Sequence, residues 1–191
     1  IFKKDYTIDK VIRNDAFLNL VVYENRTNYH IFKQDEANQD NVFIQLEKAS
    51  FRNVGVSFIH IPSKQEYLFR IDHGSLQGTF SAGNQSFLFF GSVFSTHIKS
   101  GRNTFLKDML LSIKTEMEIN KAKSTIELKG DLETGKLLFD VSGLITTDKS
   151  NKNLDLLVKI PESPLTSLVK LIPKQYIEPV KGYKLIGDVG I

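Results

Sequence analysis

Cysteine and tryptophan are absent from this chain of 191 residues, which has only five prolines. Without cysteine there are no disulfides and no thiolate chemistry. No apolar run approaches the ~20 residues that a membrane-spanning helix needs. The formal charge of +3 comes from 25 basic and 22 acidic residues, with no basic run beyond Lys3-Lys4. This balance does not favour a nucleic-acid partner, and we expect none.

Apolar residues recur at every second position over most of the chain. Between positions 109 and 119 they are Met109, Leu111, Ile113, Met117 and Ile119, with serine, lysine and glutamate between them. Side chains alternate between the two faces of a strand, so this pattern predicts a sheet with one apolar and one polar face. Hydrophobic residues make up 41% of the chain, enough to form a core.

Turn-forming residues separate these alternating stretches. Strands are predicted over 16–23, 29–33, 42–46, 48–58, 67–71, 76–81, 87–98, 109–119, 126–132, 137–145 and 154–160, and a further one begins at 183. Turns are predicted at 62–63, 72–74, 83–84, 100–103, 120–121 and 134–135, with polar loops over 33–41 and 146–153. Successive hairpins of this kind predict a mainly β fold, an antiparallel meander. Apolar residues on both faces of 87–98 predict a strand covered on both sides.

One segment has helical spacing. Ser163 suits an N-cap and Pro164 the first helical position, followed by an apolar stripe that ends before Pro173. We therefore expect one short amphipathic helix near 163–172. At about nine residues it is too short to be stable without docking on the sheet.

Residues suited to catalysis are sparse. His30, His60, His73 and His97 do not have metal-ligand spacing, so no metal is expected. No P-loop or dinucleotide-binding motif occurs, and no other cofactor is expected. Asp72 beside His73 would suit an acid–base pair, but a turn explains both residues. The sequence predicts that the protein is not an enzyme. An enzyme would instead need a pocket in which Asp72, His73 and His60 converge.

Three segments carry a resemblance to a known family. Asn28-Tyr29-His30-Ile31-Phe32-Lys33 and the stretch 46–54, LEKASFRNV, resemble elements of AsmA-like proteins from Bacteroidetes-type bacteria. The strongest likeness is at 165–187, where L-x-x-L-V-K-L-I-P-K-Q-Y is followed by K-G-Y-K-L-I-G. It is similar to the family's short helix ending in proline, its loop and its next strand. The resemblance covers about residues 16–191.

The resemblance implies a fold and a function. AsmA-like proteins, which resemble TamB and the bridge-like lipid transfer proteins in architecture, have an inner-membrane anchor and a long periplasmic sheet curled around an apolar trough. The family is implicated in phospholipid transport to the outer membrane and in envelope integrity. We expect residues 1–191 to be a single β-rich segment of a longer protein of this kind. The resemblance thus implies an open, β-taco-like groove in the periplasm, with the anchor outside this segment.

The expected partner is a phospholipid or another acyl-chain lipid. Twelve strands about 4.8 Å apart would give a trough on the order of 55 Å long. The predicted lining is Tyr67, Phe69, Ile71, Phe87, Phe89, Val93, Met109, Leu111, Ile113, Met117, Ile119, Ile126, Leu128, Leu137, Phe139 and Val141. The same residues would also suit the closed core of a β-sandwich with a structural or adhesive role at the cell surface. Alternation alone leaves both open, and the resemblance favours the groove.

Overall fold

The computed structural model describes residues 4–28, 42–81, 83–148, 151–169, 171–172, 174–178 and 186–189. The predictions for 29–33 and 33–41 lie outside these residues, as does most of the strand expected from 183. The strands are β1 (Lys4–Ile8), β2 (Val11–Val22), β3 (Val42–His60), β4 (Gln65–Ser81), β5 (Asn84–Ser100), β6 (Asn103–Phe105), β7 (Met109–Asn120), β8 (Thr125–Thr134), β9 (Leu137–Asp148), β10 (Asn151–Lys159), β11 (Ser163–Pro164) and β12 (Asp188–Val189). The helices are α1 (Leu165–Val169) and α2 (Lys174–Ile177).

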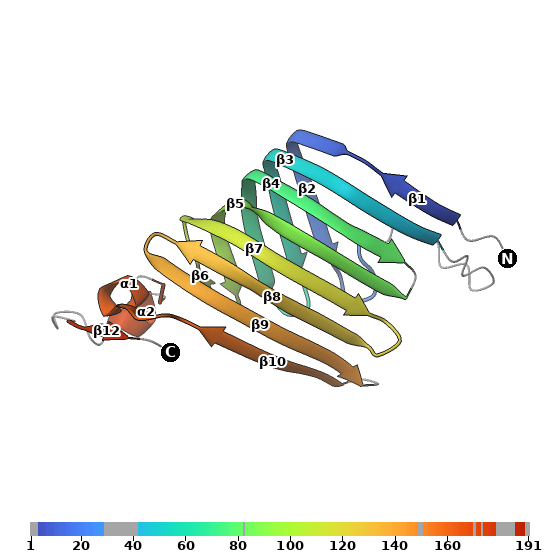
Figure 1. Ribbon diagram of the computed structural model, residues 1–191. Coiled ribbons are helices and arrows are strands. Elements are labelled where there is room, and N and C mark those ends of the chain that lie inside the picture. Colours follow the sequence, from blue (N-terminus) through green and yellow to red (C-terminus); the bar gives the residue numbers. More distant parts are fainter. Residues whose placement is uncertain are drawn as a thin grey trace.

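Ten strands form one open, curled sheet (Figure 1). Its order is β1-β3-β4-β5-β7-β8-β9-β10, with β2 also paired to β3 and β6 to β5. From β3 to β10 all pairings are antiparallel and join strands that follow one another along the chain, except that β7 pairs with β5 because β6 is a short strand also paired to β5. This confirms the predicted meander. β1 and β2 depart from it, because both lie parallel to β3, one after the other along its length. Eight strands in line, about 4.8 Å apart, span about 34 Å, so the trough is shorter than expected.

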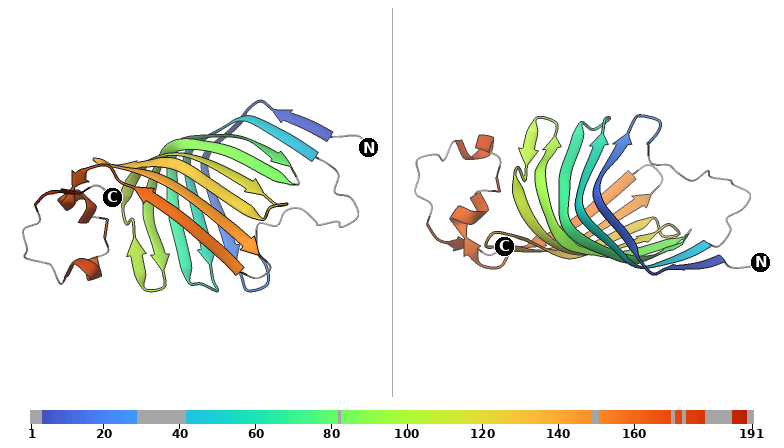
Figure 2. Two further views of the ribbon diagram at one scale, coloured as in Figure 1. Left: turned by 60° about the horizontal axis from the view of Figure 1, so that its bottom comes forward. Right: turned by 90° about the horizontal axis from the view of Figure 1, so that it is seen from above.

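The sheet is a single curved layer. Figure 2 shows β2, β3, β4 and β5 bending sharply along their length, while α1 and α2 lie beside the sheet rather than over its hollow. The solvent-accessible surface is 14178 Å², whereas a compact monomer of 21.7 kDa would expose about 9,200 Å². The large surface follows from the absence, in the described ranges, of a second layer covering the sheet.

The bend follows a line of irregular residues in neighbouring strands. In β2 and β3, Asp15 and Asn53 have positive φ angles of 49° and 50°. In β4, the register against β5 shifts between Ile71 and His73, which leaves Asp72 as the extra residue of a bulge. Bulges bend a strand and increase its local twist. Because this line crosses the strands, the strands run across the hollow, and their ends form its two rims.

Three sequence-based boundaries are corrected by these observations. The segment 72–74 is no turn, because β4 continues through it and bends there. The two strands expected over 42–58 are one strand, β3, with a register shift between Leu46 and Ala49. The loop expected over 146–153 is mostly strand, since β9 ends at Asp148 and β10 starts at Asn151. Asp, Gly and Asn favour irregular backbone, and here that backbone bends the strands without reversing them.

The short helix is present but begins later than its cap predicts. Ser163 belongs to β11, and its hydroxyl donates to the carbonyl of Pro161, so it does not cap the helix. After Val169 the winding continues through i→i−3 hydrogen bonds from the N–H groups of Leu171 and Ile172, at 3.0 and 3.1 Å. These tighter bonds are typical of a helix end. The apolar stripe is thus wound mainly as one short turn of α-helix.

Candidate functional site

All sixteen residues predicted as a lining lie on one face of the sheet. Residues paired across strands point to the same side. Phe87 pairs with Met117, which pairs with Leu128, and alternation from such rows places the rest of the sixteen on the same side. We call this side the groove face and the opposite side the back face.

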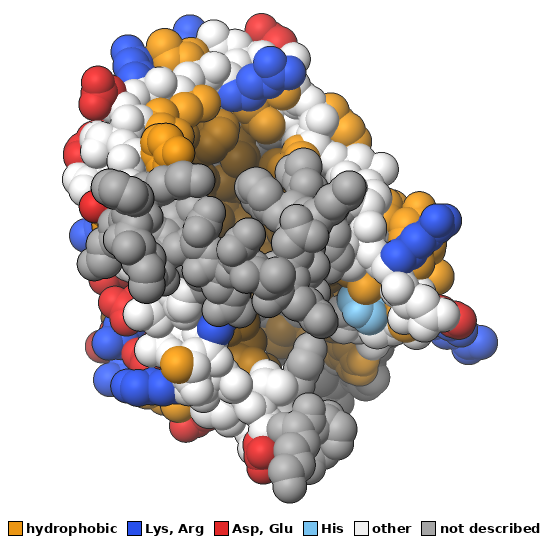
Figure 3. All heavy atoms as spheres, turned by 90° about the vertical axis from the view of Figure 1, so that its right-hand side faces the viewer, with side chains coloured by type: hydrophobic (Ala, Val, Ile, Leu, Met, Phe, Trp, Pro, Cys, Tyr) orange, Lys and Arg blue, Asp and Glu red, His pale blue; other side chains and the backbone are white. Residues whose placement is uncertain are grey.

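The groove face of β4, β5, β7, β8 and β9 carries no charged side chain. In these five strands the charged residues all fall on the back face by register: Glu66, Arg70, Lys99, Lys114, Glu116, Glu118, Glu127, Lys129, Asp131, Glu133, Asp140 and Asp148. The carboxylate of Asp72, in the bulge, is 2.6 Å from Nε of Arg70 and therefore also lies on the back face. Figure 3 shows hydrophobic side chains gathered in the hollow and charged ones around its periphery.

Burial differs sharply between the two faces at neighbouring positions. Leu111 and Leu137, on the groove face, are 2% and 3% exposed, whereas Leu110 and Leu138, on the back face, are 55% and 46% exposed. Most other members of the sixteen are half-buried, including Phe87. The groove face is therefore apolar and only partly covered by the described residues.

Two glycines allow a close approach of β4 and β5 on the groove face. Gly74 of β4 pairs directly with Gly91 of β5, and the ring of Phe89 lies against both. A Cβ on Gly91 would lie 2.5 Å from the carbonyl oxygen of His73 and 2.8 Å from Cα of Gly74. Close backbone approach of this kind is a common reason for glycine inside a strand. Ser95, further along β5, is fully buried.

The groove face includes residues outside the predicted lining. Among them are Ile44, Leu46, Val54, Val56, Phe58, Leu76, Phe80, Leu132, Ile145, Leu154, Leu156 and Val158. The alternation that identified the sixteen extends through these positions, so the same signal could have found them. The bulges near Ala49 and Asp72 shift that alternation. This explains why the predicted lining lacked residues from β3 and from the end of β4.

The strand expected to be covered on both sides is β5, and its back face is open. Phe90 is 47% exposed there. Phe94 is half-buried, with the guanidinium of Arg70 5.1 Å from its ring centroid. The apolar residues on the back of β5 are thus partly shielded by a cation rather than by a second layer.

The residues considered for catalysis do not converge. His60 lies at the end of β3, where Nδ1 accepts from the backbone N–H of Ser63 at 3.2 Å. His73 pairs with Arg52, eight positions earlier along β3, or about 26 Å along the strand. Asp72 is engaged by Arg70. In the described ranges, no three His, Cys, Asp or Glu side chains are grouped so that they could hold a metal ion.

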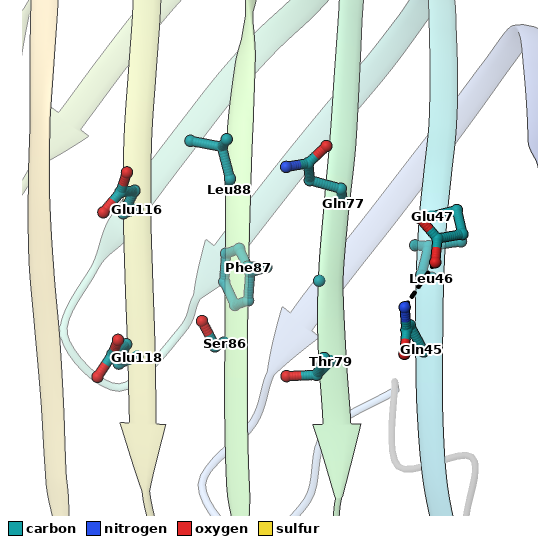
Figure 4. Close-up of a pocket in the computed structure, with 11 residues that line it drawn as sticks. Gln45, Leu46, Glu47, Gln77, Thr79, Ser86, Phe87, Leu88, Glu116 and Glu118 are labelled. Carbon is teal, nitrogen blue, oxygen red and sulfur yellow. Dashed lines mark hydrogen bonds between the residues drawn. The ribbon is translucent and has the colours of Figure 1, made fainter. Parts of the chain in front are cut away.

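A shallow cavity of about 400 Å³ lies on the back face (Figure 4). Its rim is polar, with Gln45, Gln77, Glu116 and Glu118 around Leu88. Gln45 donates to Glu47 at 2.5 Å. Such a polar depression suits hydrated side chains and differs in chemistry from the groove face.

On the back face, Glu66 forms a charged cluster with Lys99 and His97 that shifts its pKa. Glu66 lies 3.1 Å from Nζ of Lys99 and 3.1 Å from Nε2 of His97. The hydrogen bond from Lys99 first, and then the neighbouring imidazole of His97, lower the pKa of Glu66 below its ordinary value of 4.5. This cluster joins β4 to β5 on the side away from the hollow.

No protein-family model, curated protein sequence or solved structure matches the chain. Among the described residues, no helix has the length and hydropathy needed to cross a bilayer.

Proposed function

We propose that this chain binds the hydrocarbon tails of lipids along its groove face and takes part in lipid movement as a non-enzymatic groove. The observation that supports this most is the uncharged, half-exposed apolar surface on the hollow side of five consecutive strands. Large contiguous apolar surfaces that stay exposed commonly mark interaction sites.

The energetics of hydrocarbon burial fit such a surface. Each methylene removed from water contributes about 0.8 kcal/mol, and no catalytic group is required. A groove about 34 Å long, from eight strands at about 4.8 Å spacing, offers room along its axis for an extended chain. A tail lying there would cover Phe87, Met117 and Leu128, which form one row across three strands.

The resemblance to AsmA-like proteins extends this proposal to a cellular setting. In it, the chain is a section of a periplasmic lipid-conducting groove whose anchor in the inner membrane lies outside the segment. The open, curled architecture supports this assignment. The closed β-sandwich required by the structural or adhesive alternative differs from the open sheet of the described residues.

Two matched pairs of substitutions test the proposal. Met117→Asp with Leu128→Asp places charge on the groove face, while Leu110→Asp with Leu138→Asp makes the same chemical change on the back face. Native mass spectrometry of gently purified protein reports co-purified lipid, and titration with a fluorescent fatty acid reports uptake. We expect the groove variant to bind at least about tenfold more weakly, because a tail would have to lie against desolvated carboxylates.

The back-face variant is expected to keep the affinity of the unmodified chain. Circular dichroism establishes whether each variant retains its sheet. Absence of lipid and of fatty-acid uptake in the unmodified chain would refute the proposal. Equal loss in two folded variants would also contradict it, because binding would then not depend on the groove face.

A further inference from the structure

Charge is distributed unevenly between the three surfaces of the sheet. The groove face of β4 to β9 is uncharged, and the back face of the same strands is acidic in balance, with nine carboxylates against Arg70, Lys99, Lys114 and Lys129. The turns that connect these strands are instead basic in balance. Their charged residues are Lys64, Arg102, Lys107, Asp108, Lys121, Lys123 and Lys136, all of them exposed.

Asp108, the one carboxylate among these turn residues, neutralises only one of their positive charges. Asp108 lies 4.0 Å from Nζ of its neighbour Lys107, so it balances that one cation. The remaining five turn residues carry uncompensated positive charge in this set. A positive potential therefore follows the ends of the strands.

Backbone hydrogen bonds join these turns side by side along each rim. On one rim, the N–H of Gly101 donates to the carbonyl of Lys64 at 3.0 Å, so that Lys64 and Arg102 lie in adjoining turns. On the opposite rim, the N–H of Lys121 donates to the carbonyl of Gly83 at 2.9 Å, which joins the turn after β7 to the turn after β4. Lys123 lies in that same turn after β7, where its N–H donates to Oδ1 of Asn120 at 2.9 Å. The cations thus lie on both rims of the hollow.

We propose that the occupant of the groove is an amphiphile with an anionic head group, such as a phosphate, held at these basic rims while its tail lies on the groove face. This inference rests on the proposed function and names the class of its ligand. A tail on the groove face leaves its head group at an open rim, because the face itself offers no charge to pair with it. Lys and Arg at the rim attract phosphate there, and the acidic back face repels it.

The test compares amphiphiles that share a tail and differ in head group. Calorimetric titration uses dodecyl phosphate, neutral dodecyl maltoside and cationic dodecyltrimethylammonium, each as monomers, and inorganic phosphate alone. We expect dodecyl phosphate to bind about fivefold more tightly than the maltoside at low salt, with the difference falling as salt screens the rim. The cationic amphiphile is expected to bind most weakly, and inorganic phosphate not to bind.

Charge-reversed variants locate the effect. Lys121→Glu with Lys123→Glu, and separately Lys64→Glu with Arg102→Glu, should each reduce the preference for dodecyl phosphate. The four substitutions together should abolish it, while the affinity for the maltoside stays unchanged. Lys114→Glu with Lys129→Glu makes the same change of charge on the back face and should preserve the preference.

The outcomes separate the two proposals. Equal affinity for the phosphate and the maltoside would overturn the head-group inference and leave tail binding intact. Loss of the preference in the back-face control to the same degree would also overturn it, as would binding of inorganic phosphate alone with the affinity of dodecyl phosphate. Binding of none of the three amphiphiles would refute the proposed function itself.

Discussion

Asn53 donates its side-chain amide to the carboxylate of Asp15 at 2.7 Å, across two parallel strands, and both residues have left-handed backbone. The two residues lie opposite each other, between the pairs Asn14–Arg52 and Ala16–Val54. Asn and Asp tolerate this backbone better than other residues that carry a Cβ. The hydrogen bond joins the irregularities of β2 and β3 at one point on the line along which the sheet bends.

Replacing Asn53 tests the energetic cost of left-handed backbone at the bend. Asn53→Ala and Asn53→Gly both remove the hydrogen bond to Asp15, and they differ only in the Cβ. At a φ of 50° a Cβ is strained and glycine is not. We expect the alanine variant to be less stable than the glycine variant by about 1 kcal/mol in urea unfolding. Equal stabilities would show that the left-handed conformation imposes no cost at this position.

Substitution of Gly91 tests the close approach of β4 and β5 in the hollow. A Cβ there would meet backbone atoms of His73 and Gly74, which cannot move without disturbing the strands. We expect Gly91→Ala to lower the free energy of unfolding by about 1–3 kcal/mol. Gly83→Ala is the matched control, because nothing lies within 4 Å of its added Cβ. A comparable loss in both variants, measured by denaturant unfolding, would rule out crowding as the cause.

The sequence was sufficient to predict a mainly β meander, because its signals are local. Alternation from Met109 to Ile119 places side chains on two faces whatever the partner strand is. The glycine at 135 predicts a turn from the sequence, and in the structure Gly135 has a positive φ of 61°. The sixteen predicted residues share a face for the same reason. Their role in binding lipid stays a prediction.

The bends and the parallel strands could not be predicted, because they depend on distant contacts. Asp72-His73-Gly74 has the composition of a turn, yet the pairing of Ile71 with Val93 and of His73 with Ser92 keeps β4 in the sheet. Local composition does not distinguish a bulge from a reversal. The parallel pairing of β2 with β3 depends equally on long-range contacts, for which alternation has no signal.

Two adjacent leucines on opposite faces test where the core lies. Leu111 is 2% exposed and Leu110 is 55% exposed. We expect Leu111→Ala to cost about 2–5 kcal/mol of stability, because it removes buried methyl groups and leaves a cavity. Leu110→Ala is expected to change stability by less than about 0.5 kcal/mol. Thermal and urea unfolding measure the stability of both variants. Similar losses of stability would contradict the expectation that the packed core lies on the groove face.

Glu66 links stability to acid pH. Its pKa is lowered in the folded chain by Lys99 and His97, whereas the unfolded chain has the ordinary value of 4.5. Above pH 4.5 the carboxylate is ionised in both states, and its contribution to stability is fully present. As the pH falls through the lowered pKa, the folded state must also take up the proton, and the contribution is lost.

We therefore expect Glu66→Gln to be less stable than the unmodified chain at pH 7, and this difference to shrink as the pH falls below 4.5. Because the side chain of Glu66 is 38% exposed, solvent screens the effect and keeps it small. Urea unfolding between pH 7 and pH 3 measures the difference. Glu118→Gln, which removes another exposed carboxylate from the back face, is the control. A difference between Glu66→Gln and the unmodified chain that stays constant over this range would show that the cluster with Lys99 and His97 does not couple protonation to folding.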